Sequence, residues 1–280
     1  MEPILVTGAT GHVGRQVVEQ LVAAGHQVRA LARRPPDADL PVPVEVVAGD
    51  LTDPASLAAA ADGTGAVFLV WPFGHAGGAE AAVAALARYA RRIVYLSSLG
   101  AATDEDGILG MHGRLEELVE SAVPDWTLLR PGGFAANTLG WAEAIRRGDT
   151  VRGPYPTLAR PLIDERDIAA VAVAALTGEE HRGARYPLTG PAALTQVEQV
   201  ATIGEVLGRP LRFVPVDRDQ ARRDMVAAGA PEELAAAVVA GQGRLLDHPE
   251  PVLDTVAAVT GAPARPYREW VAAHVADFTG

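Results

Sequence analysis

Three glycines near the start of the chain, Gly8, Gly11 and Gly14, are spaced like the turn of a phosphate-binding site. A short apolar run at residues 4–6 precedes them and an amphipathic stretch at residues 15–24 follows, so the pattern predicts strand, tight turn and helix. Gly8 allows the sharp turn, Gly11 removes a side chain where backbone approaches phosphate, and Gly14 permits close helix–strand packing. The helix start would offer N–H groups and a positive dipole end to an anion. We therefore predict a dinucleotide site, the alternative being a turn that only packs, with these cofactor-binding residues: Gly8, Thr10, Gly11, His12, Val13 and Gly14.

The second predicted strand, residues 27–32, ends in two arginines and two prolines. In a dinucleotide-binding sheet this strand end meets the adenosine ribose, where an acid suits the 2′-hydroxyl of NAD and an arginine the 2′-phosphate of NADP. No acid stands there, because Asp37 comes only after the prolines. We expect NADPH rather than NADH as cofactor. The alternative is that Arg33 and Arg34 are solvated surface residues.

Two further strand ends carry side chains that suit a ligand. Asp50 follows the predicted strand at residues 44–47 and could accept a bond from an adenine amino group; the alternative is a loop aspartate that bonds local backbone. Trp71, Pro72 and Phe73 follow the apolar strand at residues 66–70. They would cover the cofactor ribose or wall a substrate pocket, unless they only pack beneath a loop.

A candidate reaction centre lies after the predicted strand at residues 93–96. Ser97 and Ser98 end that strand, and each could bond the acceptor oxygen or order the cofactor amide. His112, near the start of a predicted helix at residues 111–121, could donate a proton or a hydrogen bond to a developing oxyanion. The alternative is a histidine that bonds nearby backbone. The predicted catalytic residues are therefore His112, Ser97 and Ser98.

The chain contains no lysine and no cysteine; all 24 basic residues are arginine. Arginine stays protonated, so it is a poor proton donor and forms no Schiff base. Mechanisms that need lysine or a thiolate are excluded. The acidic triplet at residues 104–106 is interpreted as a solvated face, and we expect no metal site.

Composition limits the partners. The formal net charge of −11 argues against nucleic acid and anionic membranes, and no apolar run approaches the ~20 residues of a membrane span. The chain enters a strand at once, without a signal peptide, so we expect a cytoplasmic protein that acts on a small molecule. The oligomeric state stays open between monomer and homodimer.

The order of elements predicts an α/β fold, a doubly wound parallel Rossmann sheet with a smaller C-terminal α/β substrate lobe. We assign residues 1–133 to the dinucleotide-binding core and 134–280 to the lobe, interleaved as one structural unit. Beyond the elements given above, strands are expected at residues 126–130, 160–163, 184–189 and 211–216. Helices are expected at residues 53–61, 79–90, 142–147, 165–176, 195–207, 219–228, 231–246, 251–259 and 267–278.

Several segments together resemble the atypical short-chain dehydrogenase/reductases, and within them the NmrA-like group that includes NAD(P)H:quinone oxidoreductases and triphenylmethane reductase. The resemblance covers about residues 3 to 215. The segments that carry it are residues 7–14, 29–33, 49–51, 97–98, His112 with Glu116, residues 126–131, Phe134 with Asn137, and residues 166–169.

The resemblance implies roles for residues of this chain. It places Arg33 on the 2′-phosphate, Asp50 and Leu51 on the adenine, and Trp71, Pro72 and Ser97 beside the nicotinamide. Residues 131–134 would face the substrate, and residues 166–168 would be structural. The predicted substrate-binding residues are Phe73, Gly133, Phe134, Asn137, Trp141 and Tyr155.

One departure from the larger superfamily limits the chemistry. Its usual Tyr-x-x-x-Lys pair is missing, since the chain has no lysine and residues 111–121 contain no tyrosine; His112 stands in roughly that region. A quinone-like or other conjugated acceptor fits best, because it accepts hydride without a strong acid. We therefore expect an NADPH-dependent oxidoreductase of such acceptors. The alternatives are a non-catalytic dinucleotide-binding redox sensor and a redox-neutral biosynthetic enzyme on the same fold.

Overall fold

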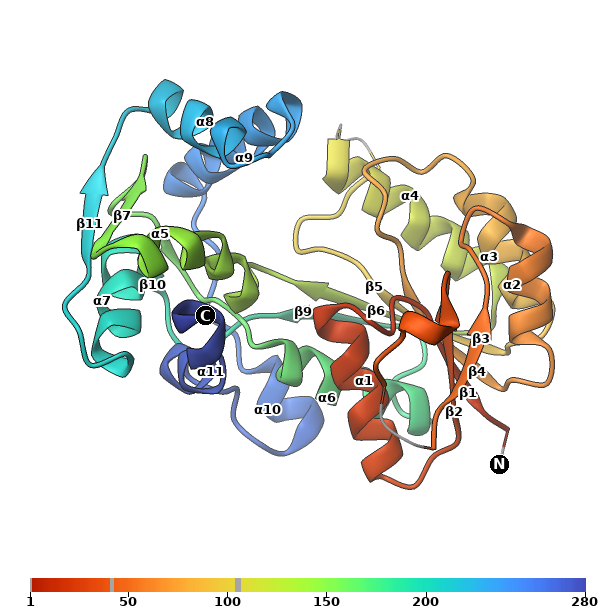
Figure 1. Ribbon diagram of the computed structural model, residues 1–280. Coiled ribbons are helices and arrows are strands. Elements are labelled where there is room, and N and C mark those ends of the chain that lie inside the picture. The colour runs from red at the N-terminus through yellow and green to blue at the C-terminus, as the bar shows by residue number, and fades with distance from the viewer. Residues whose placement is uncertain (1, 41–42, 104–106) are drawn as a thin grey trace. The chain divides into compact units, whose positions relative to one another are not determined.

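Seven parallel strands form one sheet in the order β3-β2-β1-β4-β5-β6-β9 (Figure 1). The chain runs outward from β1 to β3 and then returns to add β4 on the other side of β1. Ligands of such sheets bind at this reversal, beyond the carboxyl ends of the strands. The predicted fold class is confirmed. The strands are β1 (Ile4–Val6), β2 (Val28–Ala32), β3 (Glu45–Ala48), β4 (Ala66–Val70), β5 (Arg92–Leu96), β6 (Asp125–Pro131) and β9 (Ala184–Leu188).

The computed structural model describes residues 2–40, 43–103 and 107–280, so the acidic triplet 104–106 lies outside the described residues. It consists of two compact units. Unit 1 comprises Met1–Gly132, Glu165–Leu188 and Thr255–Pro263; unit 2 comprises Gly133–Asp164, Thr189–Asp254 and Ala264–Gly280. The chain leaves unit 1 after Gly132 and returns to it twice.

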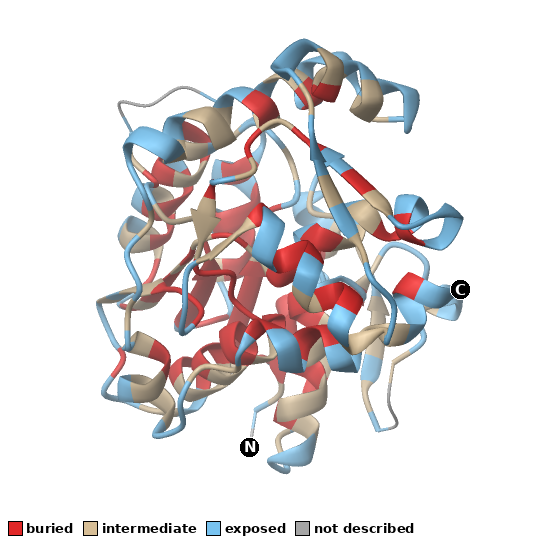
Figure 2. Cartoon of the chain, turned by 90° about the vertical axis from the view of Figure 1, so that its left-hand side faces the viewer, coloured by how far each residue is buried: buried red, intermediate tan, exposed pale blue. Residues whose placement is uncertain are grey.

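Helices cover both faces of the sheet in unit 1. On one face α1 (His12–Ala23) packs against α6 (Glu165–Thr177), which also contacts α10 (Thr255–Thr260). The other face carries α2 (Pro54–Ala61), α3 (Ala79–Ala87) and α4 (Gly107–Ala122), and a short 3₁₀ turn, η1 (Pro35–Asp37), follows β2. A parallel sheet covered in this way is apolar on both sides. All five residues of β5 are accordingly buried, as the red strands of Figure 2 show.

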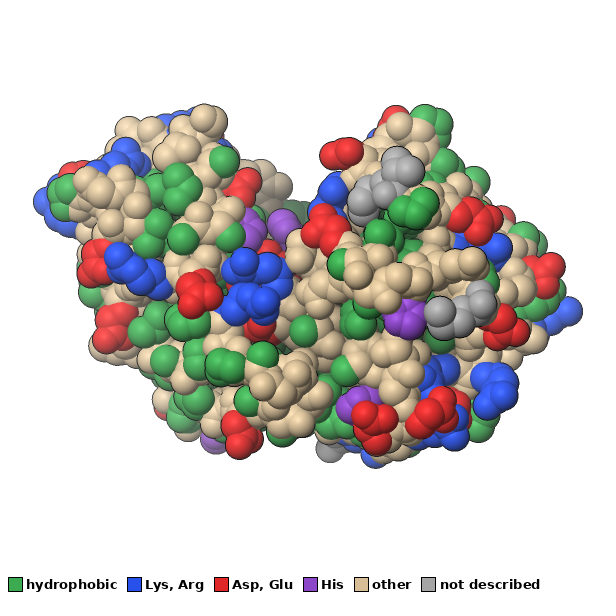
Figure 3. Space-filling model, turned by 90° about the horizontal axis from the view of Figure 1, so that it is seen from below, with side chains coloured by type: hydrophobic (Ala, Val, Ile, Leu, Met, Phe, Trp, Pro, Cys, Tyr) green, Lys and Arg blue, Asp and Glu red, His purple; other side chains and the backbone are tan. Residues whose placement is uncertain are grey.

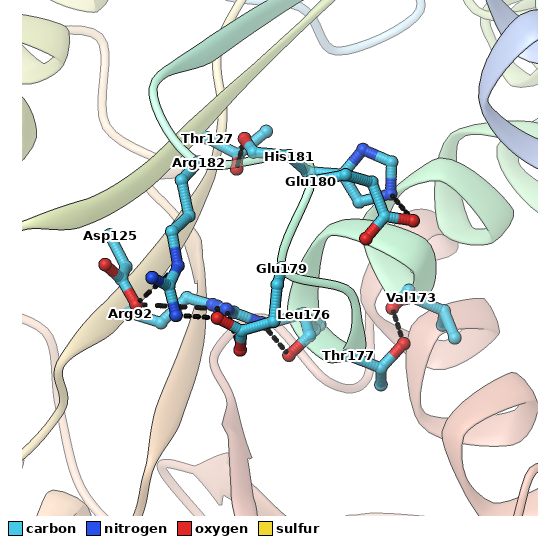
Figure 4. A network of polar contacts seen from close by, with 10 residues as sticks. All are labelled: Arg92, Asp125, Thr127, Val173, Leu176, Thr177, Glu179, Glu180, His181 and Arg182. Carbon is cyan, nitrogen blue, oxygen red and sulfur yellow. Dashed lines mark hydrogen bonds and ion pairs between the residues drawn. The ribbon is translucent and has the colours of Figure 1, made fainter.

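Buried charges fasten the amino-terminal ends of β5 and β6 to the end of α6 (Figure 4). The Arg92 guanidinium donates to the Leu176 carbonyl and to the Glu179 carboxylate, both at 2.9 Å. Arg182 lies 3.1 Å from Asp125 and also pairs with Glu179. This network lies at the opposite ends of the strands from the glycine turn, so we interpret it as structural.

Unit 2 has two small sheets and separate helices. One sheet pairs β8 (Ala159–Arg160) with β10 (Leu194–Thr195) antiparallel, and the other pairs β7 (Thr150–Gly153) with β11 (Arg212–Pro215) parallel. The helical segments are η2 (Ala135–Trp141), α5 (Ala142–Arg147), α7 (Gln196–Val206), α8 (Arg218–Ala227), α9 (Glu232–Asp247), α11 (Tyr267–Ala273) and α12 (Val275–Thr279).

Three predicted helix bounds were wrong for local reasons. Helix α4 begins at Gly107 rather than at residue 111, because glycines in its first turn hide the helical pattern. Residues 251–254 are not helical: the residue before Pro251 is disfavoured in a helix, and the Leu253 N–H donates to the Thr189 hydroxyl at 2.9 Å. The last predicted helix divides at His274, whose ring bonds the Trp270 carbonyl at 2.8 Å, the acceptor that a continuing helix would use.

One strand prediction was incorrect. The predicted strand at residues 160–163 is reduced to Ala159–Arg160 and a single bridge between Ile163 and Phe134. The strand predicted at residues 184–189 is confirmed as β9, which lies at the edge of the main sheet beside β6 although its residues fall in the segment assigned to the C-terminal lobe. The hydrophobic pattern predicted β9 as a strand. It does not show which strand β9 pairs with, because that pairing is a long-range contact.

We predict that Gly14→Ala destabilises the protein by about 1–3 kcal/mol, the usual cost of overpacking. A Cβ at this position would lie 2.1 Å from the Gly8 carbonyl oxygen, so the first turn of α1 would have to move away from β1. Urea unfolding measures the loss. Gly74→Ala is the matched control, because its Cβ would meet nothing within 4 Å. Equal stability of the two variants would contradict the packing role of Gly14.

Candidate functional site

The corner between β1 and α1 is held by its own backbone and by the end of β4. The Gly11 N–H donates to the Gly8 carbonyl at 2.9 Å, and Gly8 has a φ of +61°, a left-handed conformation that glycine adopts readily. Thr7, fully buried, accepts from the Val70 N–H at 2.8 Å and donates to the Phe68 carbonyl at 3.2 Å. Thr7 therefore fixes the turn against the neighbouring strand, a positioning role that the glycine pattern alone did not show.

This corner fits a phosphate-bearing cofactor. Gly8, Gly11 and the adjacent His12 are exposed, whereas Gly14 lies beneath them against β1. The helix is capped by Gly11, which has no side chain to occupy the first N–H groups of α1. Those groups and the positive end of the helix dipole suit an anion. Thr10 is exposed on the turn, while the Val13 side chain is in the core, so only its backbone could contact a ligand.

The two arginines after β2 have different surroundings. Arg34 forms an ion pair with Asp37 at 3.0 Å inside the 3₁₀ turn. Arg33 is exposed and has no ion-pair partner among the residues that the structure describes. A guanidinium group without a carboxylate partner at this strand end is available to a 2′-phosphate. The geometry favours Arg33 over Arg34 for that role.

Asp50 bonds its own loop through one carboxylate oxygen. Its Oδ1 accepts from the backbone N–H and from the hydroxyl of Thr52, both at 2.8 Å. These hydrogen bonds lower the pKa of Asp50, and the positive charge of Arg33 lowers it further. The local-backbone interpretation therefore holds for Oδ1, while binding of adenine by Asp50 and the half-buried Leu51 stays a prediction.

The aromatic residues after β4 mainly pack. Trp71 is 4% exposed, its indole N–H donates to the His75 carbonyl at 2.9 Å, and its ring meets Phe73 edge-on at 4.8 Å. Both side chains pack in the core cluster beneath α3 and α4, which was the alternative interpretation for Trp71. Pro72 is exposed and is the residue of this segment that remains open to a ligand.

A buried polar cluster joins the end of β5 to α4 and β6. The Ser97 hydroxyl donates to Glu116 at 2.5 Å, and Arg130 pairs with the same carboxylate through two nitrogens, Nε at 2.8 Å. The hydrogen bond and the charge of Glu116 raise the pKa of Arg130. A hydroxyl has one proton, so Ser97 can offer a ligand only its lone pairs. Ser98 is half-buried, with a single long contact, 3.5 Å to the Leu99 carbonyl.

His112 pairs with a residue that the sequence interpretation missed. The Tyr95 hydroxyl, on β5, lies 2.6 Å from His112 Nδ1, and His112 is half-buried on α4. Burial lowers the pKa of His112 to about 4, opposed in part by the charge of Glu116, and burial raises the pKa of Tyr95. Both groups are therefore neutral at pH 7. Tyr95 has no other hydrogen bond within the described part of the chain, so we assign its proton to the bond and the ring proton of His112 to Nε2.

The spacing of these residues in the sequence predicts part of the polar cluster. His112 and Glu116 are four residues apart, so a helix places them on one face, and both interact with residues of the neighbouring strands. Tyr95 stands two positions before Ser97, so alternation predicts that both side chains leave β5 on the same face. Arg130, at the end of β6, was recognised only as part of the family resemblance.

The predicted substrate residues of unit 2 fall in two places. Phe134 and Trp141 pack against the cluster around Trp270, and Asn137 between them is exposed. Gly133 gives room for Arg160, whose guanidinium carbon would lie 2.6 Å from an added Cβ. Tyr155 belongs to a different cluster and is 5% exposed. These five residues therefore form no single constellation in unit 2, and their substrate role stays a prediction.

Neither a metal-binding cluster nor a membrane-spanning helix occurs among the described residues. No group of three or more His, Asp or Glu residues there has a geometry that could hold a metal ion. No helix among them is long and apolar enough to cross a membrane. Acidic and basic side chains are interspersed on the face shown in Figure 3, which has no broad surface of a single sign.

Comparison with protein families identifies the class. Residues 8–179 match the model of an NAD(P)H-binding family, and the chain belongs to that family. The match contains the glycine corner and every strand of the main sheet except β1 and β9. The predicted nicotinamide dinucleotide cofactor is confirmed at this level, while the residues that bind it stay a prediction.

Relatives of known name cover nearly the whole chain. It is 42% identical over 279 residues to the (4-alkanoyl-5-oxo-2,5-dihydrofuran-3-yl)methyl phosphate reductase of Streptomyces griseus, covering 98% of this chain and 99% of that protein. It is 38% identical over 284 residues to the NAD(P)H azoreductase of Xenophilus azovorans, with coverage of 98% and 99%. Both are named as reductases, in agreement with the predicted class, an NAD(P)H-dependent oxidoreductase.

Solved structures give the same fold. The NADPH-dependent quinone oxidoreductase of Escherichia coli superposes with a TM-score of 0.83 at 24% identity, covering 97% of this chain and 99% of that chain. Triphenylmethane reductase of Citrobacter sp. gives 0.81 at 22% identity, with coverage of 96% and 98%. The predicted resemblance is therefore confirmed at the level of the fold.

We predict that the pair of Tyr95 and His112 makes folding stability depend on pH. The His112 pKa is about 4 in the folded chain against 6.5 for an ordinary histidine, so protonation favours the unfolded chain. The contribution is complete above pH 6.5 and is lost as the pH falls from 6.5 toward 4.

Urea unfolding at several pH values measures this dependence. His112→Gln lacks the titrating ring, so the stability difference between wild type and variant should decrease steadily over that window. A difference that is constant from pH 7 to pH 4 would contradict the burial of a neutral His112.

Proposed function

We propose that this protein is an NADPH-dependent reductase of small conjugated electrophiles such as quinones and unsaturated carbonyl compounds. The observation that supports it most is the corner between β1 and α1, where Gly8 and Gly11 are exposed and the start of α1 has no side-chain cap. A corner of this kind at the reversal of strand order holds the pyrophosphate of a dinucleotide.

The relatives support this class of acceptor. The name of the Streptomyces griseus enzyme describes an unsaturated lactone with an acyl substituent, and that of the Xenophilus azovorans enzyme an azo compound. Both names describe a conjugated, electron-poor double bond. A substrate of this kind stabilises the negative charge that follows hydride addition, so it needs no strong acid from the protein.

The side chains around β5 suit such a reaction. Bound NADPH would supply the hydride, which is the chemistry of the cofactor itself. Neutral His112, with its proton assigned to Nε2, is a hydrogen-bond donor whose Nδ1 is occupied by Tyr95. Ser97 is an acceptor, because its proton goes to Glu116. We therefore assign Ser97 to the carboxamide N–H of the cofactor, and Ser98 and His112 to the oxygen of the acceptor.

Glu116, which accepts the hydrogen bond of Ser97, has a positioning role in this proposal. Glu116 is 4% exposed and is neutralised by Arg130, so it holds the serine hydroxyl without serving as an acid. Arginine retains its proton at all ordinary pH values. Neutral His112 donates a hydrogen bond and keeps its proton, so final protonation of the product is left to water.

We predict that Arg33→Ser raises the KM for NADPH by about tenfold or more, since a charged hydrogen bond to the 2′-phosphate is lost. The KM for NADH should change little, because NADH lacks that phosphate. Steady-state kinetics with both cofactors measure the effect. Arg34→Ser is the control, since Arg34 already pairs with Asp37. An equal rise in the KM for NADPH and for NADH would contradict the binding of the 2′-phosphate by Arg33.

Purified protein should oxidise NADPH, followed at 340 nm, when given menadione, a cyclic enone or an alkylidene lactone, with a product two hydrogens heavier. His112→Leu is expected to lower kcat by about tenfold, because one hydrogen bond to the acceptor oxygen is lost. Binding of NADPH without oxidation across the panel would favour a dinucleotide sensor instead. A product of unchanged mass would indicate a redox-neutral enzyme.

A further inference from the structure

Helices α8 and α9 of unit 2 line a pocket of about 450 Å³. Cavities of roughly 300–1,000 Å³ are typical of small-molecule sites. The lining combines three arginines with an apolar wall from one face of α9: Arg218, Arg222 and Arg244, with Ala236, Val239 and Ala240. None of these residues belongs to the dinucleotide site, which lies in unit 1.

The base of the pocket is fixed by close packing. Tyr155 is 5% exposed, and its hydroxyl donates to the Val239 carbonyl at 2.9 Å. A Cβ on Gly243 would lie 2.7 Å from that hydroxyl, so α9 reaches Tyr155 only because this position is glycine. The pocket wall is thus a built surface rather than a loose gap between two helices.

The three arginines of the pocket differ in their partners. Arg218 lies over the Tyr155 ring at 5.4 Å, and neither Arg218 nor Arg244 has an ion-pair partner among the residues that the structure describes. Arg222 is different, because its Nη1 is 3.0 Å from Glu232 and its Nη2 is 3.9 Å from Asp219. Its Nε, however, is buried and makes no hydrogen bond. Buried donors normally have an acceptor, so this nitrogen points to a missing partner.

We propose that this pocket binds a small organic phosphate monoester. Two guanidinium groups without carboxylate partners match a dianion, and a phosphate monoester carries close to two negative charges at neutral pH. The carbon part of the ligand would contact Val239 and its alanine neighbours on α9. Asp219 and Asp247 also line the pocket and disfavour a larger polyanion such as nucleic acid.

Calorimetric titration with butyl phosphate and with inorganic phosphate tests the proposal, without cofactor or acceptor present. Wild type should bind butyl phosphate more tightly than inorganic phosphate. Arg218→Gln and Arg244→Gln should each weaken butyl phosphate by about tenfold or more, since each removes a charged hydrogen bond. Arg223→Gln is the matched control, because Arg223 lies on the same helix but bonds Gln220 at 2.9 Å outside the pocket.

Several results would overturn the proposal. If wild type binds neither compound, the pocket contains only water. If Arg223→Gln weakens binding as much as the pocket variants, the attraction is general surface charge. Equal affinity for the two probes would exclude an organic ligand. Thermal unfolding of each variant confirms that it is folded, and NADPH affinity should be unchanged in all three. Since no hydride acceptor is used, the result is independent of the proposed reductase activity.

Discussion

The contact between Gly14 and the carbonyl of Gly8 is the constraint on which the cofactor site depends. A Cβ at position 14 would lie 2.1 Å from that oxygen, so α1 lies against β1 only because no side chain intervenes. The close approach sets the direction of the helix and brings its first N–H groups to the exposed face of the turn. Thr7 holds the other side of the corner by bonding β4. The anion site is therefore a consequence of packing rather than of any polar side chain.

The sequence predicted the elements of this arrangement better than their partners. Residues 66–70 form an uninterrupted apolar strand because both faces are covered, and that pattern is visible without a structure. The pairing of β9 with β6 could not be predicted in this way, because it joins segments more than fifty residues apart in the sequence. The division of the last helix at His274 likewise depends on one side-chain bond to the Trp270 carbonyl. Such long-range or side-chain bonds cannot be predicted from the local periodicity of the sequence.

The same distinction applies to the site. The glycine spacing predicted the tight corner because Gly8 has a left-handed φ and Gly14 has no room for a Cβ. The role of Ser97 could not be read in this way, since it depends on where its single proton goes. The bond to Glu116 decides this, and Glu116 in turn is held by Arg130 from another strand. Trp71 illustrates the reverse case, because an aromatic residue at a strand end suggested a ligand wall and instead packs in the core.

Because the chain has no lysine, the charges around Tyr95 and His112 decide which acceptors would suit this site. An enzyme of this fold that reduces an unactivated ketone must protonate a strongly basic alkoxide, and that requires an acid whose pKa is lowered by a nearby cation. Here burial acts in the opposite direction, since it raises the pKa of Tyr95 and keeps His112 neutral. Arg130 is the nearby cation, but Glu116 neutralises it. A centre with a neutral donor and a compensated ion pair stabilises little developing charge, which supports the proposal that the acceptor is a conjugated electrophile able to delocalise that charge itself.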